Sequence, residues 1–129
     1  MQVEMLARAV VSALEDIKAR DILVLDVRQI TSLFDTVVIA TAESARQTKA
    51  LSRHVQDAAK ENGCHVYGVE GEESGEWVLV DLGDIVVHVM QPAIREYYNL
   101  EELWGGRRPL PGSAATRSSN RVEDTAKSL

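Results

Sequence analysis

The sequence predicts a single α/β domain in which helices pack against a five-stranded mixed sheet. Two stretches carry apolar residues at helical spacing, and five short runs are rich in the β-branched residues that favour strands. The expected order of elements is α-β-β-α-β-β-β-α over residues 1–104. A chain of 129 residues is long enough to bury one hydrophobic core and little more.

A first amphipathic helix is expected at the start of the chain, ending near Arg20. Its apolar residues recur at helical spacing and are Val3, Leu6, Ala7, Val10, Leu14 and Ile17. Residues 21–27 and 36–41 follow as two apolar, β-branched runs. Because neither run alternates with polar residues, we expect two strands that are buried on both faces.

A second helix is expected to begin at Ser44 and to end at Gly63. The Ser44 hydroxyl can accept from the amide of Gln47, whose side chain can reach back, which makes a capping box. Gly63 supplies the left-handed conformation that commonly ends a helix. The inward stripe of this helix is expected to hold Ala45, Thr48, Leu51, Val55 and Ala58 or Ala59.

Three further strands are expected at residues 65–69, 77–82 and 85–90. The first two are joined by residues 70–76, whose two glycines predict a mobile loop. The last two are joined by Gly83-Asp84, which is a typical signal for a tight hairpin.

Pro92 is expected to begin a closing helix with apolar contacts from Ile94, Tyr97, Tyr98, Leu100, Leu103 and Trp104. After Trp104 the composition changes, because 11 of 25 residues are Gly, Pro, Ser or Thr. Such a segment cannot bury enough apolar surface to offset its ordering entropy. We therefore predict a domain over 1–104 and a disordered basic tail over 105–129, which is either dispensable or ordered by a partner.

The charge of the domain differs from that of the tail. Residues 1–104 carry 9 Lys/Arg against 18 Asp/Glu, a net charge of −9, whereas residues 105–129 carry 5 against 2, a net charge of +3. An acidic domain repels phosphate backbones, so binding to DNA is not expected. It attracts a basic protein surface, although acidity can also serve solubility alone.

The expected cellular location follows from the absence of membrane-spanning, secretory and disulfide patterns in the sequence. No apolar run approaches the ~20 residues that a membrane-spanning helix needs, and the first residues do not have the pattern of a secretory signal. The single cysteine, Cys64, cannot form an internal disulfide or by itself anchor a zinc site. We therefore expect a cytoplasmic protein with no membrane contact.

The usual catalytic and cofactor motifs are also missing from the sequence. GxGxxG and GxxxxGK[ST] do not occur, and Ser44 lacks the glycines of a nucleophile elbow. The three histidines, His54, His65 and His88, have no metal-ligand spacing, and His88 is expected to be a hydrogen-bonded, half-buried strand residue. We therefore expect no catalytic residue, no metal ion and no cofactor.

Acidic and aromatic residues gather around the third and fourth strands. The acidic ones are Glu70, Glu72, Glu73, Glu76, Asp81 and Asp84. They form a solvated loop, an acidic docking surface or, as a third reading, a catalytic pair; the two aspartates also suit local turn amides. Trp77 shares a strand face with Leu79 and Asp81, because strand side chains alternate. That mixture is typical of an interface hot spot, with packing under the last helix as the alternative.

Several stretches, in order along the chain, resemble the ribosomal silencing factor (RsfS/Iojap) family. They are VLDV at 24–27, DTVVIAT at 35–41, SARQ at 44–47, EG at 70–71, WVLVD at 77–81, GDIVVHV at 83–89 and REYYNLEELW at 95–104. Together they cover about residues 5–104, which is nearly the whole predicted domain.

The resemblance implies a nucleotidyltransferase-like fold without catalytic motifs. It also implies binding to the large ribosomal subunit through ribosomal protein L-fourteen, which blocks joining of the small subunit and represses translation. Bacterial members are cytoplasmic, and homodimers are compatible with the family. On this basis the expected partner-binding residues are Glu70, Trp77, Leu79, Asp81, Asp84, His88, Arg95, Tyr98 and Trp104. Of these, Arg95, Tyr98 and Trp104 either border the surface or secure the last helix.

Two alternatives remain open at this point. A nucleotidyltransferase-like enzyme that binds nucleotide and metal through the acidic loop would show magnesium-dependent nucleotide binding. A generic dimeric interaction module would self-associate without a preference for either ribosomal subunit.

Overall fold

The computed structural model describes residues 2–104 and has the predicted order of elements. The elements are α1 (Gln2–Asp16), β1 (Arg20–Asp26), β2 (Thr36–Thr41), α2 (Ala45–Glu61), β3 (Gly68–Glu70), β4 (Trp77–Asp81), β5 (Ile85–Met90), α3 (Pro92–Tyr98) and α4 (Leu100–Leu103). Within residues 2–104, no helix has the length and apolar character needed to cross a membrane. The predicted tail, residues 105–129, lies outside the described residues.

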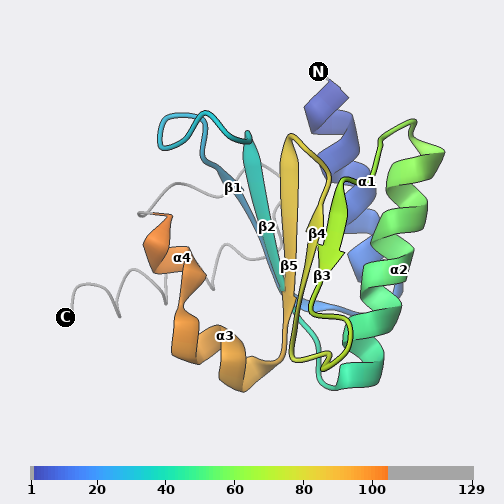
Figure 1. The fold of residues 1–129 in the computed structure, drawn as a ribbon, viewed down its shortest axis with the longest axis vertical. Coiled ribbons are helices and arrows are strands. Elements are labelled where there is room, and N and C mark those ends of the chain that lie inside the picture. Colours follow the sequence, from blue (N-terminus) through green and yellow to red (C-terminus); the bar gives the residue numbers. More distant parts are fainter. Residues whose placement is uncertain (1, 105–129) are drawn as a thin grey trace.

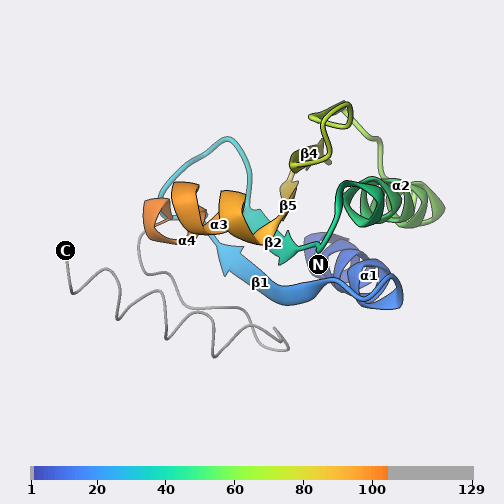
Figure 2. The same cartoon turned by 90° about the horizontal axis from the view of Figure 1, so that it is seen from below.

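The five strands form one mixed sheet in the order β1-β2-β5-β4-β3. β2 and β5 are parallel, and the other neighbouring pairs are antiparallel. Helices α1 and α2 cover one face of the sheet, while α3 and α4 lie on the other (Figures 1 and 2). The β4–β5 hairpin closes at Gly83-Asp84 as predicted, and the Leu82 amide donates to the Ile85 carbonyl at 2.9 Å.

The two faces have separate hydrophobic cores. The face under α1 and α2 is packed with buried residues from every strand except β3, and Val69 of β3 packs against its edge. The face under α3 and α4 has a smaller core of Leu23, Leu25, Val27, Val37, Ile39, Met90 and Leu100. This second core involves β1, β2 and the end of β5, so the helices above it leave the β3–β4 side of the same face less covered.

The closing helix of the prediction is divided in two at Asn99. Asn99 has a left-handed backbone (φ 48°), and its amide donates to the Arg95 carbonyl at 2.9 Å. Asparagine tolerates this conformation better than most residues, which explains why the helix breaks there. Three of the residues predicted to give this helix its apolar contacts are instead exposed, Tyr97 by 81%, Leu103 by 66% and Tyr98 by 52%.

The first helix ends four residues earlier than predicted, at Asp16 rather than near Arg20. Lys18 adopts a left-handed conformation (φ 65°), and the Ala19 amide donates to the Leu14 carbonyl at 2.9 Å. This geometry closes the helix and allows Arg20 to begin β1.

The start of α2 is capped almost as predicted. The Ser44 hydroxyl accepts from the Gln47 amide at 3.1 Å, but the Gln47 side chain accepts from the amide of Glu43 at 2.7 Å, one residue before the expected position. Its Nε2 group donates to the Ile17 carbonyl at 2.9 Å, which ties α2 to the end of α1. Gly63 follows the helix with φ 75°, as expected.

The predicted strand at 65–69 is shorter and begins later, at Gly68, and the expected mobile loop after it is packed. Gly71 and Gly75 have φ 88° and 72°. A Cβ on Gly71 would lie 2.0 Å from the Trp77 carbonyl oxygen, and one on Gly75 would lie 2.7 Å from Cβ of Ala45. The two glycines therefore hold the loop against the first residues of β4 and α2.

Candidate functional site

One part of the sheet carries the mixed apolar and acidic surface that the sequence predicts. Trp77, Leu79 and Asp81 alternate along β4 and are all half-buried, whereas Val78 and Val80 between them are fully buried under α2. On β3, Glu70 is paired with Leu79 and is exposed. On β5, His88 is also paired with Leu79, so the three side chains share one row. We call Glu70, Trp77, Leu79, Asp81, His88 and Tyr98 the open sheet face.

Trp77 lies at the end of this face that is closest to α3. Its ring centroid is 4.9 Å from that of Tyr98 and 5.9 Å from that of His88. Its indole Nε1–H donates to His88 Nδ1 at 3.0 Å. A hydrogen bond and two ring contacts therefore hold the indole in one orientation.

His88 lies next to Trp77 on the same face of the sheet and accepts its hydrogen bond. The prediction of a hydrogen-bonded strand histidine is confirmed, although the side chain is buried rather than half-buried, with 8% exposure. Burial lowers the pKa of His88 from 6.5 to about 4. The ring is therefore neutral near pH 7, and since Nδ1 accepts from Trp77, its proton is on Nε2.

Tyr97 and Tyr98 extend the aromatic surface onto α3. Tyr98 is 52% exposed, and the Tyr97 ring lies edge-on to it at 5.0 Å. Tyr97 was expected to provide an apolar contact of the closing helix, whereas it is the most exposed aromatic side chain among the described residues. The sequence already indicates this, because adjacent residues on a helix point about 100° apart and only one of the two tyrosines can face the core.

Two acidic residues, Glu70 and Asp81, lie on the open sheet face, and Glu72 is turned away from it toward α2. Asp81 accepts from the Gly83 amide at 2.9 Å, which is the local turn bond expected of this aspartate. Glu70 precedes the loop to β4, where Glu72 accepts from the Ser52 hydroxyl at 3.1 Å. Within residues 2–104, no group of three or more His, Cys, Asp and Glu side chains is arranged to hold a metal ion.

Three of the predicted partner-binding residues lie away from the open sheet face. Asp84 is in the turn before β5, whereas Trp77 is paired with Met90 at the opposite end of that strand. Arg95 is buried, and its guanidinium donates to the Asp21 carbonyl at 2.6 Å, to Thr41 Oγ1 at 2.8 Å and to Glu101 Oε2 at 3.0 Å. Trp104 packs edge-on against Phe34 at 5.6 Å. Arg95 and Trp104 thus secure the last helices, which is one of the two roles expected for them.

The family model and the curated relatives that match this chain belong to one family. Residues 1–128 match the family model described as "ribosomal silencing factor during starvation" (RsfS). A ribosomal silencing factor RsfS of Chromobacterium violaceum is 53% identical over 109 residues, which are 84% of this chain and 89% of that protein. One of Bacillus subtilis is 47% identical over 94 residues, 73% of this chain and 80% of that protein.

The fold is also similar to that of a solved structure. A crystal structure of a Chromobacterium violaceum protein superposes with a TM-score of 0.80 at 51% identity, and covers 90% of this chain and 98% of that one. At this identity the likeness supports the predicted single α/β domain and its mixed sheet.

Proposed function

Since the chain belongs to the ribosomal silencing factor (RsfS/Iojap) family, whose members are ribosome-binding regulators and not enzymes, we propose that it docks on ribosomal protein L-fourteen of the large subunit and so prevents the small subunit from joining. The action is steric, because one acidic domain occupies volume that the other subunit requires. No bond is made or broken. The proposal places the protein in the cytoplasm, where it represses translation.

The observation that carries the proposal is the pre-oriented Trp77 on the open sheet face. Aromatic anchors that are held in place and surrounded by polar groups are typical of the residues that dominate binding energy. Trp77 is fixed by His88 and Tyr98, Leu79 adds apolar area beside it, and Glu70 and Asp81 lie on the same face.

The charge of the domain supports a basic partner. Residues 1–104 carry a net charge of −9, and Glu70 and Asp81 lie on the open sheet face itself. Opposite charge on the partner speeds the encounter and orients it, while the apolar centre provides most of the affinity. We therefore expect the association rate to fall with added salt more than the dissociation rate changes.

The first test is sedimentation of the full chain with separated ribosomal subunits, followed by a subunit-joining assay. We expect co-migration with the large subunit only, and fewer joined ribosomes as the protein is added. The absence of co-migration at low salt would contradict the proposal. Magnesium-dependent nucleotide binding that is lost in Glu70→Gln or Asp81→Asn would favour the enzyme alternative. The same runs report self-association, which the exposed apolar centre of the open sheet face permits.

A matched pair of variants locates the docking surface. Trp77→Ala removes the proposed anchor, and Tyr67→Ala removes an aromatic side chain that is 65% exposed beyond the open sheet face. Loss of a central anchor costs about 2 kcal/mol or more, so large-subunit binding should weaken about 30-fold in Trp77→Ala. Tyr67→Ala should bind like the unaltered chain. If Trp77→Ala keeps both its circular dichroism spectrum and its affinity, the open sheet face is not the docking surface.

A further inference from the structure

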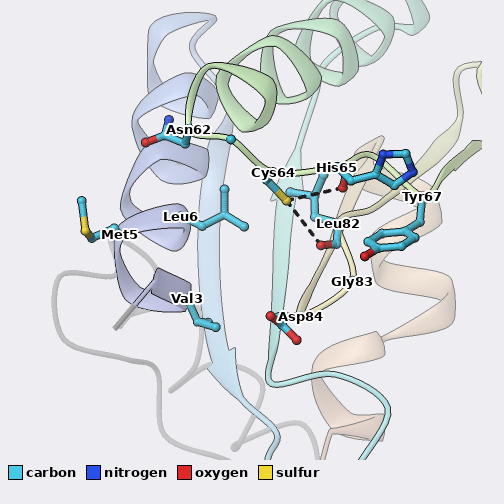
Figure 3. Close-up of a pocket in the computed structure, with 11 residues that line it drawn as sticks. Val3, Met5, Leu6, Asn62, Cys64, His65, Tyr67, Leu82, Gly83 and Asp84 are labelled. Atoms are coloured by element: carbon cyan, nitrogen blue, oxygen red, sulfur yellow. Dashed lines mark hydrogen bonds between the residues drawn. The ribbon is translucent and has the colours of Figure 1, made fainter.

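A pocket lies at the end of the sheet that is opposite to Trp77. It is bounded by the start of α1, the segment after α2 and the β4–β5 turn, and it has a volume of about 670 Å³ (Figure 3). Its lining includes Val3, Leu6, Cys64, Tyr67, Leu82 and Asp84. None of these residues belongs to the open sheet face, so the pocket is a separate feature of the molecule.

The pocket has the chemistry to bind a cation that carries an apolar group. Among the described residues of its lining, Asp84 is the only carboxylate, and none is Lys or Arg. Val3, Leu6 and Leu82 supply apolar walls on the sides facing α1 and the hairpin (Figure 3). A cation in this position would be paired with the carboxylate, while its apolar neighbour would be removed from water.

Tyr67 is held in place as the aromatic wall. Its ring lies edge-on to His65 at 4.7 Å and covers Gly83, where an added Cβ would lie 2.8 Å from the Tyr67 ring. Gly83 has φ 89°, so the turn and the tyrosine both require a glycine here. An aromatic ring attracts a guanidinium or ammonium group, so Tyr67 offers a cation in this pocket a second contact besides Asp84.

We propose that this pocket binds a basic peptide segment with an apolar side chain beside its cation, and that the segment is part of the chain's own residues 105–129. These 25 residues contain five Lys or Arg and two Asp or Glu. Arg107 and Arg108 are followed closely by Leu110, which gives a cation and an apolar group within a few residues. The net charge of +3 is opposite to that of the pocket and of the domain.

The described chain ends at Trp104, which packs in the α3/α4 core on the other face of the sheet, and it is linked to Asp84 of the pocket through Phe34 and Asp35. Trp104 touches the Phe34 ring, and the next residue, Asp35, donates its amide to the Asp84 carbonyl at 2.8 Å. A 25-residue segment spans up to roughly 80 Å when extended, so it can reach every part of the pocket from Trp104. The inference is independent of ribosome binding.

Cys64 provides a direct probe of the occupied pocket. It is the only cysteine of the chain and lines the pocket, where burial and the charge of Asp84 raise the pKa of its thiol. Alkylation of the full chain by iodoacetamide is followed over a pH series, so that the rate constant of the thiolate is obtained separately from its pKa. A segment bound in the pocket protects the sulfur in proportion to its occupancy.

Two full-length variants with the same charge change give the comparison. In the tail variant, all five basic residues after position 104 become Gln; they are Arg107, Arg108, Arg117, Arg121 and Lys127. In the control, five basic residues of the domain become Gln; they are Arg8, Lys18, Arg46, Lys49 and Arg53. We expect Cys64 to react at least about threefold faster in the tail variant, and at the unaltered rate in the control.

Two further measurements decide which segment occupies the pocket. A synthetic peptide of residues 105–129 added to the tail variant should restore the slow rate, and salt at about 0.5 M should remove the protection in the unaltered chain. Equal rates in the unaltered chain and the tail variant would overturn the proposal. Protection that increases with protein concentration would also overturn it, because the occupant would then be the tail of a second copy.

Discussion

The two faces of the sheet are built from the same strands but differ in what covers them. On the α1/α2 side, the side chains from the four longer strands are apolar and buried, and α1 and α2 pack over them (Figure 2). On the other side, α3 and α4 cover the β1–β2 half; Trp77 packs against the edge of this core, and the rest of the open sheet face lies beside it. The first face contributes mainly to stability, and the open sheet face has the features of a docking surface.

Along strand β4, residues of the buried core alternate with residues of the open sheet face. Val78 and Val80 are fully buried, whereas Trp77, Leu79 and Asp81 between and beside them are half-buried on the opposite face. Because side chains alternate along a strand, adjacent residues belong to different faces. Substitutions at neighbouring positions should therefore separate folding from binding, and the predictions below test how completely they do so.

The largest expected effect is a loss of stability when the buried Arg95–Glu101 ion pair, which holds α3 and α4 on the sheet, is broken. Arg95→Met leaves Glu101 buried without its partner, and breaking a buried ion pair from one side costs about 3–5 kcal/mol. The double variant Arg95→Met, Glu101→Leu removes both charges and should recover most of that loss. Urea unfolding of the single and double variants measures both free energies. Equal destabilisation in the two would show that the carboxylate is not the cause.

The second expected effect is a loss of stability in acid from His88, beneath Trp77. Its pKa is lowered to about 4 in the fold, against 6.5 when unfolded. Above pH 6.5 the ring is neutral in both states. Between pH 6.5 and 4 only the unfolded chain takes up the proton, so the free energy of unfolding falls as the pH is lowered and stops falling below pH 4. The total loss is about 3 kcal/mol, of which about 2 kcal/mol has occurred at pH 5.

Urea unfolding at pH 7 and pH 5 measures this contribution. His88→Gln should lack it, whereas His54→Gln, which removes an exposed histidine next to Asp16, should retain it. Protonation also turns His88 Nδ1 into a donor facing the Trp77 indole N–H, so the tryptophan loses its acceptor under the same conditions. If His88→Gln loses as much stability between the two pH values as the unaltered chain does, the proton is taken up elsewhere.

The order of elements was predictable because periodicity and turn chemistry are local signals. The β2 and β5 ranges, Ser44 as the N-cap and the Gly83-Asp84 turn all agree with the structure. One error occurs where a tertiary contact overrides a local preference, because Gln47 reaches the end of α1 instead of completing a local box. The break at Asn99 is a different case, because the tolerance of asparagine for the left-handed conformation is itself a local signal.

The candidate site was only partly predictable for a related reason. Alternation along one strand groups Trp77 with Leu79 and Asp81, and the sequence alone shows this. The pairing of β4 with β5, which places His88 under Trp77, depends on the hairpin register. The separation of Asp84 from Trp77 follows from the predicted turn, whereas the burial of Arg95 against Asp21 and Thr41 depends on how the helices are placed in space, which no local pattern specifies.

A third prediction compares neighbours on β4. Val78→Ala removes two buried methyl groups and should cost about 2 kcal/mol of stability, while the folded protein binds the large subunit as before. Leu79→Ala should cost under about 1 kcal/mol of stability, because the side chain is half-buried, but should weaken binding about tenfold. Unfolding and sedimentation of both variants test the separation of the two faces. If Val78→Ala weakens binding as much as Leu79→Ala, the two roles are coupled through the strand.

The smallest expected effect concerns the boundary that we propose at residue 104. A chain that ends at Trp104 keeps both cores and the whole open sheet face, since all their residues lie within 2–104. Its affinity for the large subunit should therefore be unchanged, and its free energy of unfolding should fall by no more than about 1 kcal/mol, which is the contribution of a weakly bound tail.

The same shortened chain distinguishes a tail that only follows the domain from one that occupies the pocket. Cys64 should alkylate faster in it, as in the tail variant, while subunit binding stays unchanged and the free energy of unfolding falls by no more than about 1 kcal/mol. A large loss of stability would instead mean that residues after 104 complete one of the cores. The boundary would then lie further along the chain, and the comparison between the two faces would need to include those residues.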